Sequence, residues 1–81
     1  MKLRATQTWE RLPDTSFFMQ CQSKSGIRIC KSNTQPTTSN AGYLLSENQV
    51  VDTDTHDIFI GTCWVKAEHG NSEDFEYDAR A

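Results

Sequence analysis

Apolar and polar residues alternate along several short stretches of this chain, and no run of a dozen residues carries apolar positions at the spacing of a helix face. Alternation with a period of two is typical of a β-strand with one buried face. The pattern predicts strands at residues 6–12, 16–22, 27–31, 43–45, 58–67 and 75–79, with a brief pairing at Val50 and Val51. Polar turns separate these segments. The sequence therefore predicts an all-β protein, a single-domain antiparallel β-sandwich or β-barrel.

The segments 16–22 and 27–31 also predict their own register. If Cys21 pairs with Ile27 across a loop of residues 22–26, the apolar side chains of both segments share one face. A slip by one residue would mix glutamines with isoleucines, so burial favours the first register. The shared face comprises Phe17, Met19, Cys21, Ile27 and Ile29. We therefore expect a hairpin in which Cys21 and Cys30 point to opposite faces and form no disulfide with each other.

Residues 58–67 form the most apolar of the predicted strands. Strict alternation would place apolar side chains on both of its faces, as in a strand that is buried on both sides. A small core covers only one face, so the other needs a second sheet or a second subunit. We therefore expect an oligomer in which this strand and the first tryptophan form the contact. The predicted subunit interface comprises Trp9, Ile58, Phe59, Ile60, Trp64 and Val65.

The composition supports one thin-cored domain. The chain has 81 residues, of which 36% are hydrophobic, and domains of this size often need a partner, a metal or disulfides for stability. We divide it into an N-terminal arm with the first strand, residues 1–11, and an antiparallel β domain, residues 12–81. The polar loop at 32–42 is long for so small a domain, which is typical of contact segments.

Charge and cysteine content indicate the class of partner and the compartment. The formal net charge is −3 and no basic stripe occurs, so we expect no nucleic-acid partner. No run of about 18 apolar residues and no signal-peptide pattern occur, so we expect neither membrane insertion nor secretion by that route. Three cysteines without paired spacing favour a reducing cytosol, or a particle assembled in one.

Candidate chemistry is sparse. The alternating carboxylates of residues 52–57 could hold a hard cation, but they lack the glycine and glutamate that complete a calcium loop, so a plain acidic turn is favoured. His56, His69 and the cysteines lack the spacing of a zinc site. Neither a nucleophile elbow nor a phosphate-binding glycine loop occurs. We expect no catalytic residue, no metal ligand and no cofactor, and so no enzyme.

The order of segments resembles a group of small tailed-bacteriophage virion proteins, the head-decoration (cement) and head-fibre-like β domains. The resemblance runs from about Trp9 to the C-terminus. It is carried by a first hairpin at 17–30, Gln35-Pro36 followed by 42–45, and a late strand at 60–67. The best matches in that strand are Trp64, Lys66 and Ala67.

The resemblance implies a structural role, because members of that group assemble on a capsid or on a head or tail appendage, commonly as trimers. We therefore expect a homotrimer, in preference to a dimer, that binds the major capsid protein or another virion protein. It would be located in the virion after assembly in the host cytoplasm. The arm and the long loop are the expected contact segments. The predicted capsid contacts are Lys2, Arg4, Gln35, Pro36 and Tyr43.

Two other functions stay open. The first is a glycan-binding or host-surface-binding module of a tail fibre. Such a module needs exposed pairs of aromatic side chains, and only Phe18 lies clearly off the inferred core face. The second is a small cytosolic inhibitor of one host protein.

Overall fold

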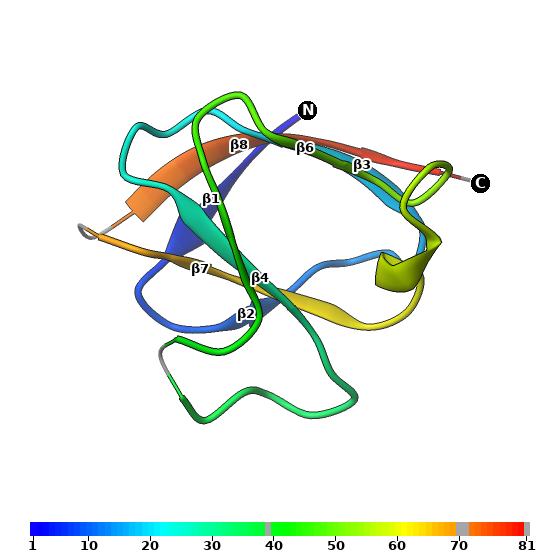
Figure 1. The fold of residues 1–81 in the computed structure, drawn as a ribbon, viewed down its shortest axis with the longest axis horizontal. Coiled ribbons are helices and arrows are strands. Elements are labelled where there is room, and N and C mark those ends of the chain that lie inside the picture. The colour runs from blue at the N-terminus through cyan, green and yellow to red at the C-terminus, as the bar shows by residue number, and fades with distance from the viewer. Residues whose placement is uncertain (39, 70–71, 81) are drawn as a thin grey trace.

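Two four-stranded antiparallel β-sheets form the protein in the computed structural model, which describes residues 1–38, 40–69 and 72–80 (Figure 1). The first sheet contains, in order, β1 (Lys2–Thr6), β8 (Ser72–Ala79), β3 (Phe17–Cys21) and β6 (Val50–Asp52). The second contains β2 (Glu10–Arg11), β7 (Cys63–Ala67), β4 (Ile27–Lys31) and β5 (Tyr43–Leu45). The described residues include no α-helix, and one short 3-10 helix, η1, spans Asp57–Phe59. The predicted all-β fold is confirmed, in the form of a sandwich.

The core lies between the two sheets, and the alternation seen in the sequence supplies it. Every second side chain of β3 and β4 is buried, as is every second side chain in β7 and in the centre of β8. Phe17 stacks on Tyr77 with ring centroids 5.7 Å apart, and Phe75 meets Tyr77 edge-on at 6.3 Å. Each such side chain contributes about 1.5–3 kcal/mol on burial. The predicted strands at 27–31 and 43–45 have the observed bounds.

The predicted hairpin between residues 16–22 and 27–31 is wrong. β3 pairs with β6 and β8 in the first sheet, whereas β4 pairs with β5 and β7 in the second. The segment between them crosses from one sheet to the other (Figure 1). The apolar face inferred for the pair is nevertheless fully buried, because two strands that face each other across a sandwich share one core as well as two neighbours in a hairpin do.

The N-terminal segment belongs to the sheet. The predicted strand at 6–12 is wrong: β1 ends at Thr6, β2 begins at Glu10, and the two strands lie in different sheets. β1 pairs with β8 along its whole length, and the Met1 ammonium group lies 3.4 Å from Glu76 Oε2. Residues 1–11 therefore form no free arm, and the prediction of an arm that extends to a capsid is corrected.

The apolar run at 58–67 is not one strand. Residues 57–59 form η1, with Phe59 N donating to His56 O at 3.1 Å, and β7 begins only at Cys63. Gly61 between them has φ 134°, a backbone conformation that favours glycine and that interrupts the extended chain. Only the second half of the run therefore alternates between two faces. Ile58 and Ile60 precede the strand on an irregular segment.

The long polar loop covers the outer face of the second sheet. Trp64 Nε1 donates to Ser32 O at 3.0 Å, Trp9 Nε1 donates to Thr38 O at 3.0 Å, and Gln35 Nε2 donates to Trp9 O at 2.8 Å. Trp9 is only 6% exposed although it lies outside the central core cluster. The second apolar face of β7, expected to need another subunit, is thus covered by the protein's own loop.

Candidate binding site

A groove opens along the side of the sandwich where β5 and β6 lie. Both are the last strands of their sheets, so within the described residues neither has a strand on its far side. Residues of both strands line the groove, together with the segment that forms η1. Its volume is about 260 Å³, below the roughly 300–1,000 Å³ of typical small-molecule sites. The groove is too small to enclose a cofactor, and its volume could hold a few side chains of another molecule.

Exposed apolar side chains border this groove. Tyr43 is 59% exposed, Leu44 47% and Ile58 60%. The Tyr43 ring packs edge-on against Phe59, with centroids 5.5 Å apart, and so is held at the rim. The buried floor comprises Leu45, Val51 and Phe59. Exposed apolar residues that gather around one hollow typically mark an interaction surface.

The turn that joins β5 to β6 fixes the rim at one end. Gln49 Oε1 accepts a hydrogen bond from Ser46 N at 3.0 Å, and Asn48 N donates to Cys21 O at 2.7 Å. Asn48 has φ 69°, in the left-handed region that asparagine adopts more readily than most residues. Cys21 N in turn donates to Gln49 O at 3.0 Å. The rim is therefore tied to β3 and is formed before any partner binds.

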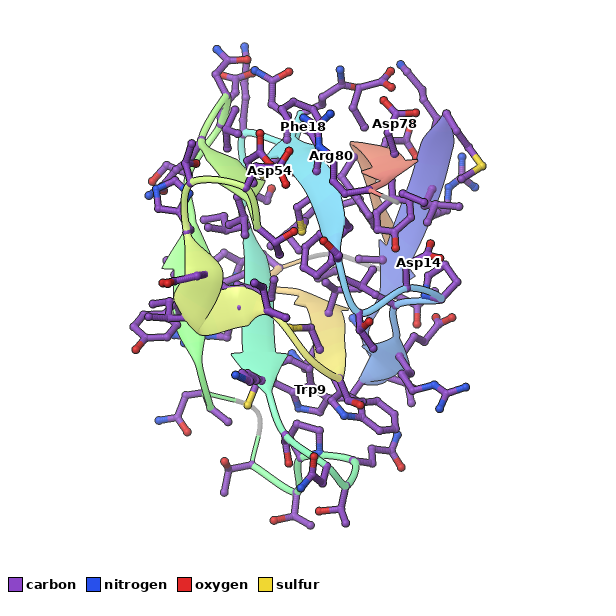
Figure 2. All side chains as sticks on the ribbon, turned by 90° about the vertical axis from the view of Figure 1, so that its right-hand side faces the viewer. Trp9, Asp14, Phe18, Asp54, Asp78 and Arg80 are labelled. Carbon is purple, nitrogen blue, oxygen red and sulfur yellow. The ribbon has the colours of Figure 1, made fainter. Side chains whose placement is uncertain are left out.

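The opposite side of the sandwich has a different character. A hollow of about 230 Å³ lies there between β1 and β2 and is lined in part by Arg4, Glu10 and Arg11. Its lining includes none of the strongly exposed large apolar side chains of the described residues. Figure 2 shows the two sides together, with β5 (green) and η1 (yellow-green) on the left and β1 (blue) on the right. The two hollows thus differ chiefly in the apolar rim.

The acidic turn at residues 52–57 binds a side chain of the protein itself. Arg80 Nη2 donates to Asp52 Oδ2 at 3.0 Å, and Arg80 Nε lies 3.6 Å from Asp54 Oδ2. The same guanidinium lies 5.5 Å from the centre of the Phe18 ring (Figure 2). Arg80 therefore occupies the place that a cation would take. It also covers Phe18, the aromatic residue that the sequence places off the core face.

Hydrogen bonding lowers the pKa of Asp52. The main cause is the Asp54 backbone N–H, which donates to Asp52 Oδ1 at 3.0 Å, and Arg80 adds to the effect against some desolvation. His56 Nδ1 lies 3.3 Å from Thr55 Oγ1, so the imidazole takes part in the local bonding of the turn. Within the described residues, no group of three or more His, Cys, Asp or Glu is placed to hold a metal ion.

The chain around the groove is acidic. Between residues 32 and 65 the sequence contains no lysine or arginine, whereas it contains Glu47, Asp52, Asp54 and Asp57. Arg80 pairs with two of these. Glu47 and Asp57 are exposed, flank residues that line the groove, and form no ion pair with another described residue. The rim of the groove therefore carries uncompensated negative charge.

The residues predicted for a subunit interface do not form one surface. Trp9, Phe59 and Val65 are buried, so the prediction of an interface is wrong for these three: Phe59 and Val65 face the core between the sheets, and the loop residues Gln35 and Thr38 bond to Trp9. Trp64 is partly buried under that loop. Only Ile58 and Ile60 are strongly exposed, and Ile58 alone of these two lines the groove.

The residues predicted to contact a capsid lie at separate places. Lys2 and Arg4 are on β1, and Arg4 Nε donates to Asp74 Oδ1 at 3.1 Å. Gln35 and Pro36 are in the loop that packs on Trp9. Tyr43 is on β5 at the opposite edge of the sandwich from β1. The structure brings only Tyr43 to the groove. Sequence reasoning missed Leu44, whose signal is the unbroken apolar run of residues 43–45.

Other ionisable groups serve the core. Tyr77 is fully buried, and its hydroxyl donates to Asp14 Oδ2 at 2.8 Å. Burial, followed by the Asp14 carboxylate, raises the pKa of Tyr77 well above its usual range. Burial also raises the pKa of the Cys63 thiol to about 11, and Cys63 Sγ donates to Phe59 O at 3.2 Å. These groups stay neutral near pH 7 and stabilise the interior.

Comparison with protein families, curated proteins and solved structures finds no match for this chain. No helix among the described residues has the length and apolar character needed to span a membrane. The site is therefore interpreted from its geometry. The groove offers apolar contacts, nearby acidic residues and the free edge of β5, and these are features of a binding surface.

Proposed function

We propose that this protein is a non-catalytic assembly module that binds another protein through the groove between β5 and β6. The observation that carries the proposal is the pair of exposed apolar side chains, Tyr43 and Ile58, where the edge strands of both sheets meet, with Leu44 exposed beside them on the outer face of β5. The largest apolar patch on a monomer is often a functional surface.

Two features support protein binding at this place. An edge strand presents a backbone N–H and C=O outward at every second residue, which a partner strand can pair with. The rim is already rigid, because the turn at 46–49 is hydrogen-bonded to β3. A preformed site loses little conformational entropy on binding. The groove thus combines apolar contact with directional hydrogen bonding.

The bacteriophage interpretation gives this proposal a setting. In that setting the partner is the major capsid protein or another virion protein, and the domain is a cement, decoration or short fibre protein. The interpretation rests on the sequence resemblance, and mass spectrometry of purified virions tests it. The homotrimer belongs to the same interpretation and is tested by light scattering on the isolated protein. Ser32 and Thr38 of the polar loop accept hydrogen bonds from Trp64 and Trp9, so the exposed face of β7 no longer supports a trimer and the homotrimer rests on the resemblance.

Site-directed photo-cross-linking tests the proposed function in the cell that makes the protein. A photoreactive amino acid replaces Ile58 at the groove or, as a control, Lys2 on β1 at the opposite edge. Both side chains are exposed, so neither replacement disturbs the core. Irradiation, denaturing purification and mass spectrometry then identify the adducts.

The proposal predicts one dominant adduct with a defined protein from the Ile58 position and none from Lys2. An equal yield from both positions, or adducts from Lys2 alone, would refute the groove as the binding surface. An adduct with a second copy of this chain would assign the groove to self-assembly.

A further inference from the structure

The shape of the groove limits what can fill it. A symmetric contact between two copies places the same surface on both sides, so it would bring together two copies of the acidic residues that flank the groove, Glu47 and Asp57, and like charges repel. An asymmetric contact needs an apolar part that protrudes from the second copy. Outside the groove lining, the strongly exposed large apolar residues of the described chain are Met1 and Ile60 alone. A second copy therefore offers little that fits.

The exposed apolar area is also small for a domain–domain contact. Tyr43, Leu44 and Ile58 are each about half exposed. At roughly 200 Å² for a large apolar side chain, they present about 300 Å² together. A standard protein interface buries about 800 Å² on each partner. The area is therefore that of a short segment laid along one strand.

Charge restricts the chemistry of that segment. Glu47 lies in the turn between β5 and β6, and Asp57 begins η1, so an acidic residue flanks the groove-lining residues at each of these two places. Two arginines are engaged elsewhere, Arg28 with Glu68 and Arg80 with Asp52, and Lys31 lies over Gly61, which is outside the groove lining. A basic segment gains from both carboxylates, whereas an acidic one is repelled.

We propose that the groove binds an extended segment of a different protein chain, in which aliphatic side chains alternate with lysine or arginine and which pairs with the free edge of β5. This inference rests on the proposed function and names the class of its partner. The aliphatic side chains of one face enter the groove beside Ile58. The basic side chains of the other face lie near Glu47 and Asp57.

Synthetic nine-residue peptides test the inference on the full chain. One alternates valine with lysine, a second valine with glutamate, and a third valine with threonine. Amide chemical shifts in ¹⁵N-labelled protein report both the affinity and the place of binding. We expect the valine–lysine peptide to shift residues 43–45, 50–52 and 56–59. We expect it to bind at least tenfold more tightly than the valine–glutamate peptide.

Matched variants separate groove binding from general attraction between a cationic peptide and an anionic protein. Ile58→Asp and Ile60→Asp add the same charge to side chains of similar exposure, and only Ile58 lines the groove. General attraction would rise equally in both variants. We expect Ile58→Asp to weaken the valine–lysine peptide at least tenfold and Ile60→Asp to leave it unchanged. The pair Glu47→Gln with Asp57→Asn should weaken it about fivefold at low salt.

Each other outcome overturns the inference in a recognisable way. If the three peptides bind the groove equally, the preference for a basic segment is wrong and the proposed function stands. If none binds while the Ile58 cross-link still captures a protein, the partner is not an extended segment. If none binds and no cross-link forms, the proposed function fails as well. A dimer in light scattering that Ile58→Asp dissociates would make a second copy the occupant.

Discussion

Trp9 should hold the long loop on the second sheet, and its removal should release that loop. The indole is 6% exposed, donates to Thr38 O at 3.0 Å, and its backbone carbonyl accepts from Gln35 Nε2 at 2.8 Å. The loop also covers Trp64, whose indole donates to Ser32 O. Trp9→Ala removes both the buried ring and its hydrogen bond. Trp9→Phe keeps most of the ring and removes the hydrogen bond alone.

The expected magnitudes differ between these two variants. Truncation of a buried aromatic side chain to alanine costs about 3–5 kcal/mol. A domain of this length is stable by about 4–12 kcal/mol in total, so Trp9→Ala should remove about a quarter of that stability or more. Trp9→Phe should cost about 1–2 kcal/mol, because the Thr38 carbonyl loses its donor. Gln35→Ala removes one further hydrogen bond and should cost about 1 kcal/mol.

Urea denaturation followed by circular dichroism measures these free energies of unfolding. Fluorescence reports the loop itself, because the chain has two tryptophans and Trp64 is the only one left in the variants at position 9. Trp64 emission should shift to the red in Trp9→Ala and stay unchanged in Trp9→Phe. A cost below about 1 kcal/mol for Trp9→Ala, together with unchanged Trp64 emission, would refute the reasoning that this residue holds the loop.

Three further predictions concern single residues. Tyr77 has a raised pKa in the folded protein, so the unfolded chain loses its phenolic proton at a lower pH than the folded chain does. The free energy of unfolding should therefore fall as pH rises above about 10, and the fall should be smaller in Tyr77→Phe. Urea denaturation at alkaline pH measures both. The pKa of Asp52 is lowered in the folded protein, so the ionised carboxylate stabilises the fold above about pH 4 and this stabilisation is lost at lower pH. The difference in free energy of unfolding between wild type and Arg80→Gln should therefore shrink at pH 2.5. A constant difference would contradict the ion pair. Gly42 has φ 76°, and a Cβ there would lie 2.1 Å from Ile29 O. Gly42→Ala should therefore lower the free energy of unfolding by at least about 2 kcal/mol. A melting temperature equal to that of wild type would contradict this.

The strands of the core could be predicted from the sequence because burial on one face leaves a period of two. Ile27, Ile29, Phe75 and Tyr77 all follow it. Strand pairing could not be predicted in the same way. Alternation identifies the side chains that face the core and not the strand that lies next to them. Cys21 and Ile27 both face the core from different sheets, and the same alternation would fit a hairpin. Neighbouring strands are decided by contacts distant in sequence, such as those of β1 with β8.

The candidate site was harder to predict than the core. Residues 58–67 read as one strand because apolar residues run through it, and only the φ of Gly61 separates η1 from β7. The groove depends on two edge strands lying on the same side, which the order of strands decides. The loop is held by hydrogen bonds from the two tryptophan side chains to backbone carbonyls, Trp9 to Thr38 O and Trp64 to Ser32 O. Every residue has a backbone carbonyl, so the sequence does not show which of them accept these bonds.

One measurement tests most directly whether the groove between β5 and β6 is the binding surface. It compares the affinities of two variants for the protein that the Ile58 cross-link identifies. The two carry the same change at exposed positions two residues apart, Ile58→Asp inside the groove and Ile60→Asp outside it. We expect Ile60→Asp to bind as wild type does and Ile58→Asp to bind at least tenfold more weakly, while both unfold at the wild-type urea concentration. Equal affinity of the two variants would contradict the account.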